Sequence, residues 1–514
     1  MKVCSNCGTQ YDDSVKFCAK CGTKLPDEAE MILNVDDPVP AENEEKAPAA
    51  PKTIAGMPIA KFAALAAAAL AVILLLVIFI PKLFAGGGSG TALKDFVYLY
   101  PNAEDEWIGF SKSGKIVKQK SEDRITDGSW AADGTLFVFV TNEDEMWTFN
   151  GSSFKKVAEN VDSFKVSQSG KGIAYVDEDD TLYLYNGSKS QKVAEEIESF
   201  KCISPDGKAV AFTKKDDDVS KAYLYNGKVQ ELGKGITPMY LSEDGKLIYL
   251  RRSTDSGNAY YVQKGTDSDS RQKLGDKFSN VIFNNSGTQV VYFDGSKAYF
   301  SENGGERQSI GSNKMQLLTS GELAPGAVFS AVANLKNQFY AVSGDQGYTI
   351  SKLTSKLELE SRIKNVNEKE LLPDGKTLIY SKNGNLYSAD ISKSSPESTK
   401  LVDSYYRYYV SLDGKMILYL DEDKVTYTMK LGGKPQKVSE DSADETTPCG
   451  SGFLYLLDDE LYFTTGGKGS KVSGLSDDVQ DLGNAYVYTI IECDDDSVYL
   501  TTNGKSLKKI YAGN

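Results

Sequence analysis

The sequence predicts a mainly β protein whose C-terminal region, residues 95–514, forms a β-propeller of seven to ten four-stranded blades. The first observation is a repeat: the glycines of five tight turns stand at positions 134, 170, 207, 245 and 287, at intervals of 36, 37, 38 and 42 residues. The second is that stretches rich in β-branched and aromatic residues separate these turns. Four short strands repeated at this period are typical of propeller blades, which close into a ring and leave few bare strand edges.

The turn that marks each repeat has glycine in its third position, and most copies have lysine in the fourth. Glycine suits such turns because it adopts positive φ angles at no steric cost. The clearest copies are Ala132-Asp133-Gly134-Thr135, Gln168-Ser169-Gly170-Lys171, Pro205-Asp206-Gly207-Lys208, Glu243-Asp244-Gly245-Lys246, Asn285-Ser286-Gly287-Thr288, Pro373-Asp374-Gly375-Lys376 and Leu412-Asp413-Gly414-Lys415.

One repeat, residues 163–195, shows the internal order of strands and turns. We expect strands at 164–166, 172–176, 181–185 and 191–194, joined by a Ser-Gly turn, an acidic turn at 177–180 and a turn at Asn186-Gly187. The repeats that contain Ser204-Pro205-Asp206-Gly207-Lys208 and Leu372-Pro373-Asp374-Gly375-Lys376 resemble the WD-like repeats of TolB-type propellers. Weaker turns near Gly326, Gly452 and Asn484 bring the count to about ten units, and a β-sandwich array or a β-solenoid is the alternative fold.

Four cysteines near the N-terminus predict a structural zinc site. Cys4 and Cys7 form one C-x-x-C pair and Cys18 and Cys21 the other, each followed by glycine. Four thiolates close the tetrahedral coordination of Zn²⁺ and leave no position for a substrate. A module of residues 1–25 has too small a core to fold alone, so metal binding has to supply on the order of 10–16 kcal/mol. The pairs resemble the zinc ribbons that begin many bacterial membrane proteins, and two disulfides or a redox pair are the alternative.

A membrane anchor is predicted between this module and the repeats. Residues 26–56 are acidic and proline-rich, which favours a disordered linker. Residues 57–84 contain nineteen consecutive apolar residues, Phe62 to Ile80, which is long enough for a helix to cross a bilayer. A cleaved signal peptide is the alternative. Residues 85–94 include Gly86 to Gly90 and are expected to be a flexible tether.

The orientation in the membrane depends on two weak signals that agree. Lys46, Lys52 and Lys61 precede the apolar run and Lys82 and Lys94 follow it, an excess of one on the N-terminal side. Zinc-binding thiolates also favour a reducing compartment. We therefore expect a single-pass cell-membrane protein with a cytoplasmic N-terminus and an extracellular C-terminal domain.

Charge is sorted between two classes of turn, which predicts a ring with one acidic face. Turns between second and third strands are acidic at Glu143–Glu145, Asp177–Asp180, Asp216–Asp218, Asp421–Asp423, Asp458–Glu460 and Asp494–Asp496. Turns on the opposite face carry Lys171, Lys208, Lys228, Lys246, Lys376, Lys415, Lys434 and Lys505. Such a face would attract cations or basic partners. The alternative is that these acidic residues only form turns and keep the domain soluble.

Two further groups of side chains have uncertain roles. The cluster Tyr405-Tyr406-Arg407-Tyr408-Tyr409 either packs internally or stacks on sugars. Cys202, Cys449 and Cys493 lie far apart in the sequence, so a disulfide between Cys449 and Cys493 and buried free thiols both remain open.

Composition excludes several kinds of chemistry. The chain has no histidine, so it cannot assemble a Ser-His-Asp or Cys-His nucleophile. Its net charge of −14 argues against a nucleic-acid partner, which needs a concentrated basic surface. No G-x-S-x-G motif is present, and no catalytic or cofactor-binding residue is predicted.

These features together predict a membrane-anchored binding or scaffold protein rather than an enzyme. The propeller would recognise an envelope or extracellular ligand, and the zinc ribbon would contact a cytoplasmic protein. A propeller enzyme with paired carboxylates, such as a glycan-cleaving hydrolase, is one alternative. A transmembrane sensor is the other.

Overall fold

The computed structural model describes residues 97–514 with short gaps, and four pairs of strand residues nearer the N-terminus. The gaps within 97–514 are 101–105, 112–113, 132–133, 217–218, 255–256, 313–314, 320–333, 338, 345–346, 373, 444, 486–487 and 513–514. The chain divides into two compact units, Met1–Val77 and Ile78–Asn514.

The described part of the first unit consists of two strand pairs. β1 (Lys2–Val3) pairs with β2 (Gln10–Tyr11), and β3 (Thr53–Ile54) pairs with β4 (Met57–Pro58) across the predicted boundary at residue 56. The four predicted zinc ligands, most of the linker, the apolar run at 62–80 and the tether at 85–94 lie outside the described residues. None of the residues that the structure describes belongs to a helix long and apolar enough to cross a membrane.

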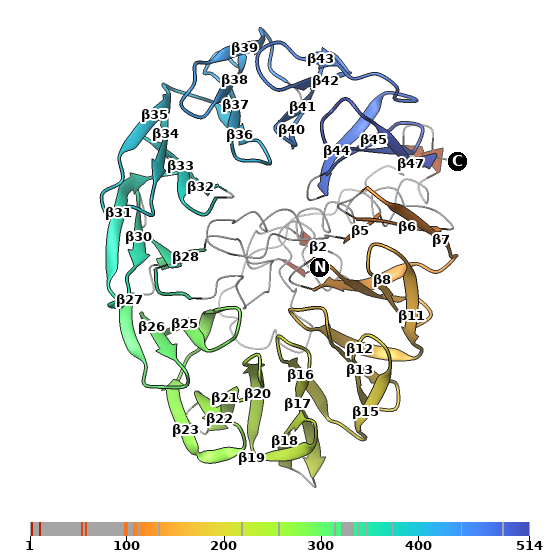
Figure 1. Ribbon diagram of the computed structural model, residues 1–514, viewed down its shortest axis with the longest axis vertical. Coiled ribbons are helices and arrows are strands. Elements are labelled where there is room, and N and C mark those ends of the chain that lie inside the picture. The colour runs from red at the N-terminus through yellow and green to blue at the C-terminus, as the bar shows by residue number, and fades with distance from the viewer. Residues whose placement is uncertain are drawn as a thin grey trace, which may run out of the picture. The chain divides into compact units, whose positions relative to one another are not determined.

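The second unit is a β-propeller, as predicted. Its described residues form eleven antiparallel sheets, which follow one another around a ring in chain order (Figure 1). Blade 1 has three strands, β5 (Val97–Tyr100), β6 (Glu106–Ser111) and β7 (Ile116–Lys120), and the other ten have four each.

The four strands of each remaining blade stand in sequence order within their sheet. Blade 2 is β8 (Ile125–Trp130), β9 (Phe137–Thr141), β10 (Met146–Phe149) and β11 (Phe154–Ala158); blade 3 is β12 (Val161–Val166), β13 (Ile173–Asp177), β14 (Leu182–Tyr185) and β15 (Ser190–Ala194); blade 4 is β16 (Ser199–Ile203), β17 (Ala209–Asp216), β18 (Val219–Asn226) and β19 (Val229–Lys234); blade 5 is β20 (Ile236–Leu241), β21 (Leu247–Thr254), β22 (Gly257–Lys264) and β23 (Asp267–Gly275); blade 6 is β24 (Ser279–Phe283), β25 (Gln289–Asp294), β26 (Lys297–Glu302) and β27 (Gln308–Ser312).

The second half of the ring continues the same order. Blade 7 is β28 (Met315–Thr319), β29 (Phe339–Ser343), β30 (Tyr348–Leu353) and β31 (Leu359–Val366); blade 8 is β32 (Lys369–Leu371), β33 (Thr377–Lys382), β34 (Asn385–Asp390) and β35 (Ser398–Val402); blade 9 is β36 (Arg407–Val410), β37 (Met416–Leu420), β38 (Thr426–Lys430) and β39 (Gln436–Ser439); blade 10 is β40 (Thr446–Cys449), β41 (Gly452–Leu457), β42 (Glu460–Thr464) and β43 (Ser470–Lys471); blade 11 is β44 (Val479–Ala485), β45 (Tyr488–Cys493), β46 (Ser497–Thr501) and β47 (Lys508–Ala512).

Blade 3 confirms the strand order predicted for residues 163–195, and the count of eleven exceeds the predicted seven to ten by one. The additional blade is blade 1. The marker turns by which the repeats were counted join the first and second strands of blades 2 to 11, and none of them lies in blade 1. Between Met315 and Tyr348, where the markers are weak, the described residues include β28 and β29, the first two strands of blade 7.

The marker turn is held together by the serine that precedes it. In blade 4, Ser204 Oγ accepts a hydrogen bond from the backbone N–H of Ala209 at 2.9 Å and donates one to Asp206 Oδ1 at 2.7 Å. Ser242 in blade 5 and Ser411 in blade 9 make the same pair of bonds. All three serines are buried, so these bonds satisfy hydroxyl groups that water does not reach. The Ser-x-Asp-Gly pattern is therefore a local device for reversing the chain.

The core lies between neighbouring blades, because the second strand of each blade is buried on both faces. In blade 4, Ala211 packs with residues of blade 5 and Phe212 with residues of blade 3. Stacked tyrosine pairs join the second and third strands of several blades: Tyr175–Tyr183, Tyr380–Tyr387, Tyr419–Tyr427 and Tyr455–Tyr462, with ring centroids 5.1–5.6 Å apart. Cross-strand aromatic pairs stabilise sheets, which accounts for the high tyrosine content.

The ring closes where blade 11 meets blade 1. The rings of Tyr100 and Tyr511 lie 6.5 Å apart, and those of Phe110 and Tyr488 lie 5.5 Å apart. Lys508 Nζ donates a hydrogen bond to the backbone oxygen of Gly114. Each of these contacts joins side chains or turns, and no strand from one end of the chain completes the sheet at the other end among the described residues.

Candidate functional site

The propeller has two turn-bearing faces, and the topology confirms that acidic and lysine-bearing turns lie on opposite ones. The described turns that follow second strands emerge on the acidic face, at 142–145, 178–181, 421–425, 458–459 and 494–496, whereas 217–218 lies outside the described residues. The turns that follow first and third strands emerge on the lysine face, at 167–172, 204–208, 227–228, 242–246, 372–376, 411–415, 431–435 and 502–507. Antiparallel strands joined in order require this alternation.

The lysine face is less positive than its lysines suggest, because several of them pair with a carboxylate of their own turn. Lys208 Nζ lies 3.1 Å from Asp206, and Lys246 Nζ lies 3.0 Å from Asp244. Lys415 makes the same contact with Asp413 at 3.6 Å. Such exposed pairs contribute little to stability, about 0–1 kcal/mol, but they cancel charge locally.

The acidic face keeps its charge mainly in the turns after the second strands. The connections between blades also carry carboxylates, but a lysine three residues earlier on the fourth strand neutralises many of them. The pairs are Lys156–Glu159, Lys192–Glu195, Lys273–Asp276, Lys400–Asp403 and Lys437–Glu440. By contrast, Asp179, Asp180, Asp458 and Asp459 are exposed and make no ion pair with any described residue.

Backbone geometry also favours aspartate at several of these turn positions. Five aspartates of these turns have positive φ angles between 52° and 62°: Asp144, Asp180, Asp458, Asp459 and Asp496. Asp and Asn are among the few non-glycine residues that adopt this left-handed conformation readily. Asn would serve the turns equally well, so the charge itself is a separate property of the face.

The tyrosine cluster at 405–409 is mostly internal, with one exposed ring. Tyr405 donates a hydrogen bond to Glu368, and Tyr408 packs beside the core between blades 8 and 9. Tyr406 is 59% exposed, which is more than any other large hydrophobic side chain in the described residues. Lys424 Nζ lies 5.7 Å from its ring centroid, within cation–π distance. Internal packing is therefore confirmed for part of the cluster, and Tyr406 remains available on the acidic face.

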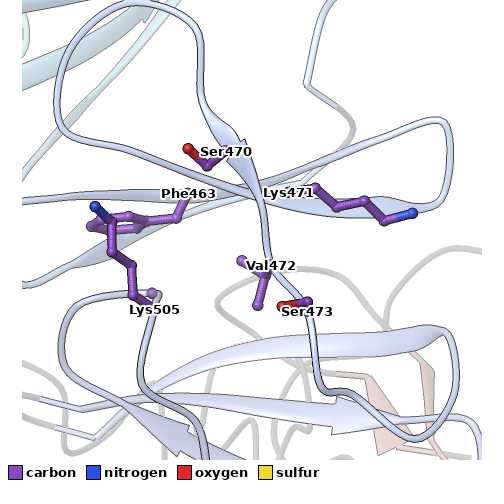
Figure 2. Close-up of a pocket in the computed structure, with 7 residues that line it drawn as sticks. Phe463, Ser470, Lys471, Val472, Ser473 and Lys505 are labelled. Carbon is purple, nitrogen blue, oxygen red and sulfur yellow. The ribbon is translucent and has the colours of Figure 1, made fainter.

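A shallow cavity of about 300 Å³ lies between blades 10 and 11 (Figure 2). Lys505 runs alongside the ring of Phe463, and Lys471 points away toward its ion-pair partner Glu460. The wall is completed by Ser470, Val472, Ser473 and Gly504. It contains no carboxylate, so this cavity does not provide the paired acids of a glycoside hydrolase.

The three C-terminal cysteines are free and buried. Cys449 and Cys493 belong to one apolar cluster between blades 10 and 11 but form no disulfide. Burial raises the pKa of Cys202 to about 12 and that of Cys449 to about 11. Both thiols therefore remain protonated at neutral pH and behave as small apolar side chains.

Sequence reasoning missed one half-buried acid, Glu492 on β45. Burial, and then the nearby charges of Asp481 and Asp496, raise the pKa of Glu492 to about 7. A hydrogen bond with Tyr100 acts in the opposite direction on this pKa, and the buried Oε1 atom has no hydrogen-bond partner among the described residues. A single charged residue within an otherwise apolar strand, Tyr-Thr-Ile-Ile-Glu-Cys, was the available signal.

The zinc-ligand prediction lies outside the described residues, but the strands around the first cysteine pair suit it. β1 ends one residue before Cys4, and β2 begins three residues after Cys7. The pairing of Val3 with Gln10 brings the two ends of this stretch together, as a zinc knuckle requires. Four sulfur ligands in two C-x-x-C pairs also match the donor set that structural Zn²⁺ prefers. Among the described residues, no group of three or more His, Cys, Asp or Glu is arranged to hold a metal ion.

Comparison with known proteins matches one segment to a family model by sequence and also found solved structures of low similarity. Residues 3–25 match the family model of a zinc-ribbon domain. No curated protein sequence matches the chain. The crystal structure of a eukaryotic initiation factor shares 14% identity with a TM-score of 0.40, covering 67% of this chain and 96% of that one.

Two TolB proteins are also similar in structure. A putative TolB from Agrobacterium tumefaciens shares 19% identity with a TM-score of 0.27, covering 38% of this chain and 86% of that one. TolB from Acinetobacter baumannii shares 11% identity with a TM-score of 0.25, covering 60% and 80%. The chain therefore combines an N-terminal segment that matches the zinc-ribbon domain with a β-propeller of eleven blades.

Proposed function

We propose that this chain is a membrane-anchored binding or scaffold protein that uses the acidic face of its propeller to bind a basic partner. The apolar run at 62–80 is the anchor, the propeller lies outside the cell, and the zinc ribbon contacts a protein in the cytoplasm. The partner outside is an envelope or extracellular ligand. No step of this function is catalytic.

The observation that carries the proposal is the concentration of unpaired carboxylates on one face. Other carboxylates of this face pair with a lysine of the preceding fourth strand, as in Lys192–Glu195, Lys400–Asp403 and Lys437–Glu440. Aligned charges of one sign create a field that raises the association rate of an oppositely charged partner by about 10- to 1000-fold at low salt. The face thus selects a cationic partner.

Tyr406 supplies the apolar contact that charge alone does not provide. It lies in the connection from blade 8 to blade 9, on the acidic face, with more than half of its surface exposed. Exposed tyrosines are frequent energetic centres of interfaces because they bury a large area and lose little side-chain entropy. We expect the partner to cover this ring.

Crosslinking in intact cells tests the proposal with two matched quadruple variants. One neutralises the acidic face, Asp179→Asn, Asp180→Asn, Asp458→Asn and Asp459→Asn, and Asn tolerates the left-handed turns. The other neutralises the lysine face at Lys171, Lys228, Lys434 and Lys505, each changed to Gln. The first is expected to lower the crosslinked partner at least tenfold and the second less than twofold. Equal effects of the two variants would refute the assignment of the acidic face.

The topology needs a separate measurement. Protease applied to intact cells is expected to remove the propeller and leave the zinc ribbon. Loss of the ribbon with retention of the propeller would reverse the proposed orientation. A chain that stays in solution without detergent would contradict the anchor.

A further inference from the structure

The cavity between blades 10 and 11 lies at the lysine-face ends of these blades. The turns at 465–469 and 502–507 follow the third strands of the two blades, so both emerge on the lysine face. Phe463, next to the end of β42, pairs with Ser470 across the first turn, and the second turn contributes Lys505. The cavity is therefore on the face opposite the acidic turns.

A short fourth strand gives the cavity one of its walls. β43 has two residues, whereas the fourth strands of the other four-stranded blades have four to nine. Beyond Lys471, the backbone N–H of Val472 still donates to the oxygen of Leu461 at 2.8 Å. The chain then leaves the sheet, so Val472 and Ser473 line the cavity instead of continuing the strand (Figure 2).

Gly504 allows the turn of blade 11 to lie directly on the ring of Phe463. A Cβ added to Gly504 would lie 2.2 Å from two carbon atoms of that ring, so any side chain at this position would displace it. The φ angle of 64° also favours glycine here. Phe463 and Val472 are both buried hydrophobic residues, and together they form an apolar floor.

Lys505 supplies a cation at the edge of this floor. Its backbone is fixed within the turn, because Asn503 Oδ1 accepts a hydrogen bond from the N–H of Lys505 at 2.9 Å. The side chain runs alongside the ring of Phe463 and makes no ion pair with any residue that the structure describes. The other lysine of the cavity, Lys471, is paired with Glu460. The cavity thus combines an apolar floor with one uncompensated positive charge.

We propose that this cavity binds a small ionised carboxylic acid whose apolar part is a single ring or a chain of similar size. Lys505 and the hydroxyl groups of Ser470 and Ser473 donate to the carboxylate, because neither hydroxyl has a hydrogen-bond partner among the described residues. The apolar part of the ligand lies on Phe463 and Val472. An apolar surface with a few polar groups at its edge is typical of small-molecule sites.

The size of the cavity agrees with such a ligand. An apolar cavity of about 150 Å³ holds one benzene molecule. The volume between blades 10 and 11 is about 300 Å³, which leaves room for a carboxylate beside the ring. This site goes beyond the proposed function, since its ligand is an acid and the partner of the acidic face is a base.

Saturation-transfer NMR with benzoate tests the inference on the full-length chain in detergent, with detergent micelles alone as the blank. Benzoate is expected to bind saturably at neutral pH. Acetate lacks the ring and benzyl alcohol lacks the charge, so each should bind at least fivefold more weakly.

Three substitutions at exposed positions identify the site. Lys505→Gln removes the charge and is expected to weaken benzoate binding at least fivefold, whereas Lys505→Arg retains the charge and should stay within twofold of the wild type. Ser473→Leu places a larger side chain in the cavity and is expected to weaken binding at least fivefold. The control is Lys434→Gln, which removes an exposed lysine of the same face on blade 9 and should leave binding unchanged.

Three results would overturn the inference. The first is the absence of saturable benzoate binding, and the second is equal binding of benzoate and benzyl alcohol. The third is an equal effect of Lys505→Gln and Lys434→Gln. None of them bears on the acidic face, because the quadruple variant at Asp179, Asp180, Asp458 and Asp459 tests that face independently.

Discussion

Glu492 makes the closure of the ring sensitive to pH. Burial raises the pKa of Glu492 from 4.5 to about 7, because the carboxylate form loses its hydration between blades 11 and 1. The neutral form is therefore favoured in the folded protein. Stability from this group is fully present below pH 4.5 and is lost as the pH rises through 7. At about 1.4 kcal/mol per pKa unit, the loss amounts to about 3 kcal/mol.

The substitution Glu492→Gln tests this reasoning, because glutamine keeps the shape and cannot ionise. At pH 8 the variant is expected to be more stable than the wild type by up to about 3 kcal/mol, and at pH 4.5 the two should be equal within about 0.5 kcal/mol. Comparing the two proteins at each pH cancels the general repulsion of a chain with net charge −14.

Tryptophan emission during urea unfolding is the appropriate assay. All three tryptophans, Trp107, Trp130 and Trp147, lie in blades 1 and 2, so their emission reports on the blades next to the closure. The exposed Glu422→Gln on blade 9 is the control and should show the pH dependence of the wild type. The reasoning is refuted if Glu492→Gln is no more stable than the wild type at pH 8, or if its advantage does not shrink between pH 8 and pH 4.5.

Three further predictions concern packing, metal and thiols. A methyl group added by Gly172→Ala would lie 2.3 Å from the backbone oxygen of Gly207 in the next blade. We therefore expect urea unfolding to show a free energy of unfolding lower by about 1–3 kcal/mol. The decrease should be less than half as large for the control Gly433→Ala, whose new carbon meets only its own turn, at 3.1 Å. Cys7→Ser is expected to abolish zinc in metal analysis of the purified chain, whereas Cys449→Ser should retain one ion per chain. Because burial raises the pKa of Cys202 to about 12, a thiol reagent should modify it only after urea unfolds the blades; rapid labelling of the native protein would contradict its burial.

The fold was predictable from the sequence because its main signals are local. A serine, an aspartate and a glycine within five residues, as in Ser204 to Lys208, bond to one another and reverse the chain without help from distant segments. Alternating apolar and polar residues then assign the strands on either side. Blade 1 was missed for the same reason, because none of the marker turns that were counted lies in it.

The candidate site was only half predictable. The sorting of charge between the faces follows from strand order, which the turns determine. Whether a lysine is free or paired does not follow, because the pairs depend on side-chain geometry: Lys208 pairs with Asp206 of its own turn, whereas Lys505 makes no ion pair with any residue that the structure describes. The free state of Cys449 and Cys493, which share a cluster without bonding, also required the structure.

The sequence by itself determined the repeated hairpins, their strand order and the cysteine spacing of the N-terminal domain, since each depends on residues within a few positions of one another. Only the tertiary structure decided how many blades complete the ring and that Glu492 is half-buried where the first and last blades meet. These features join residues more than four hundred positions apart, such as Tyr100 and Tyr511, and no local pattern encodes which distant surfaces come into contact.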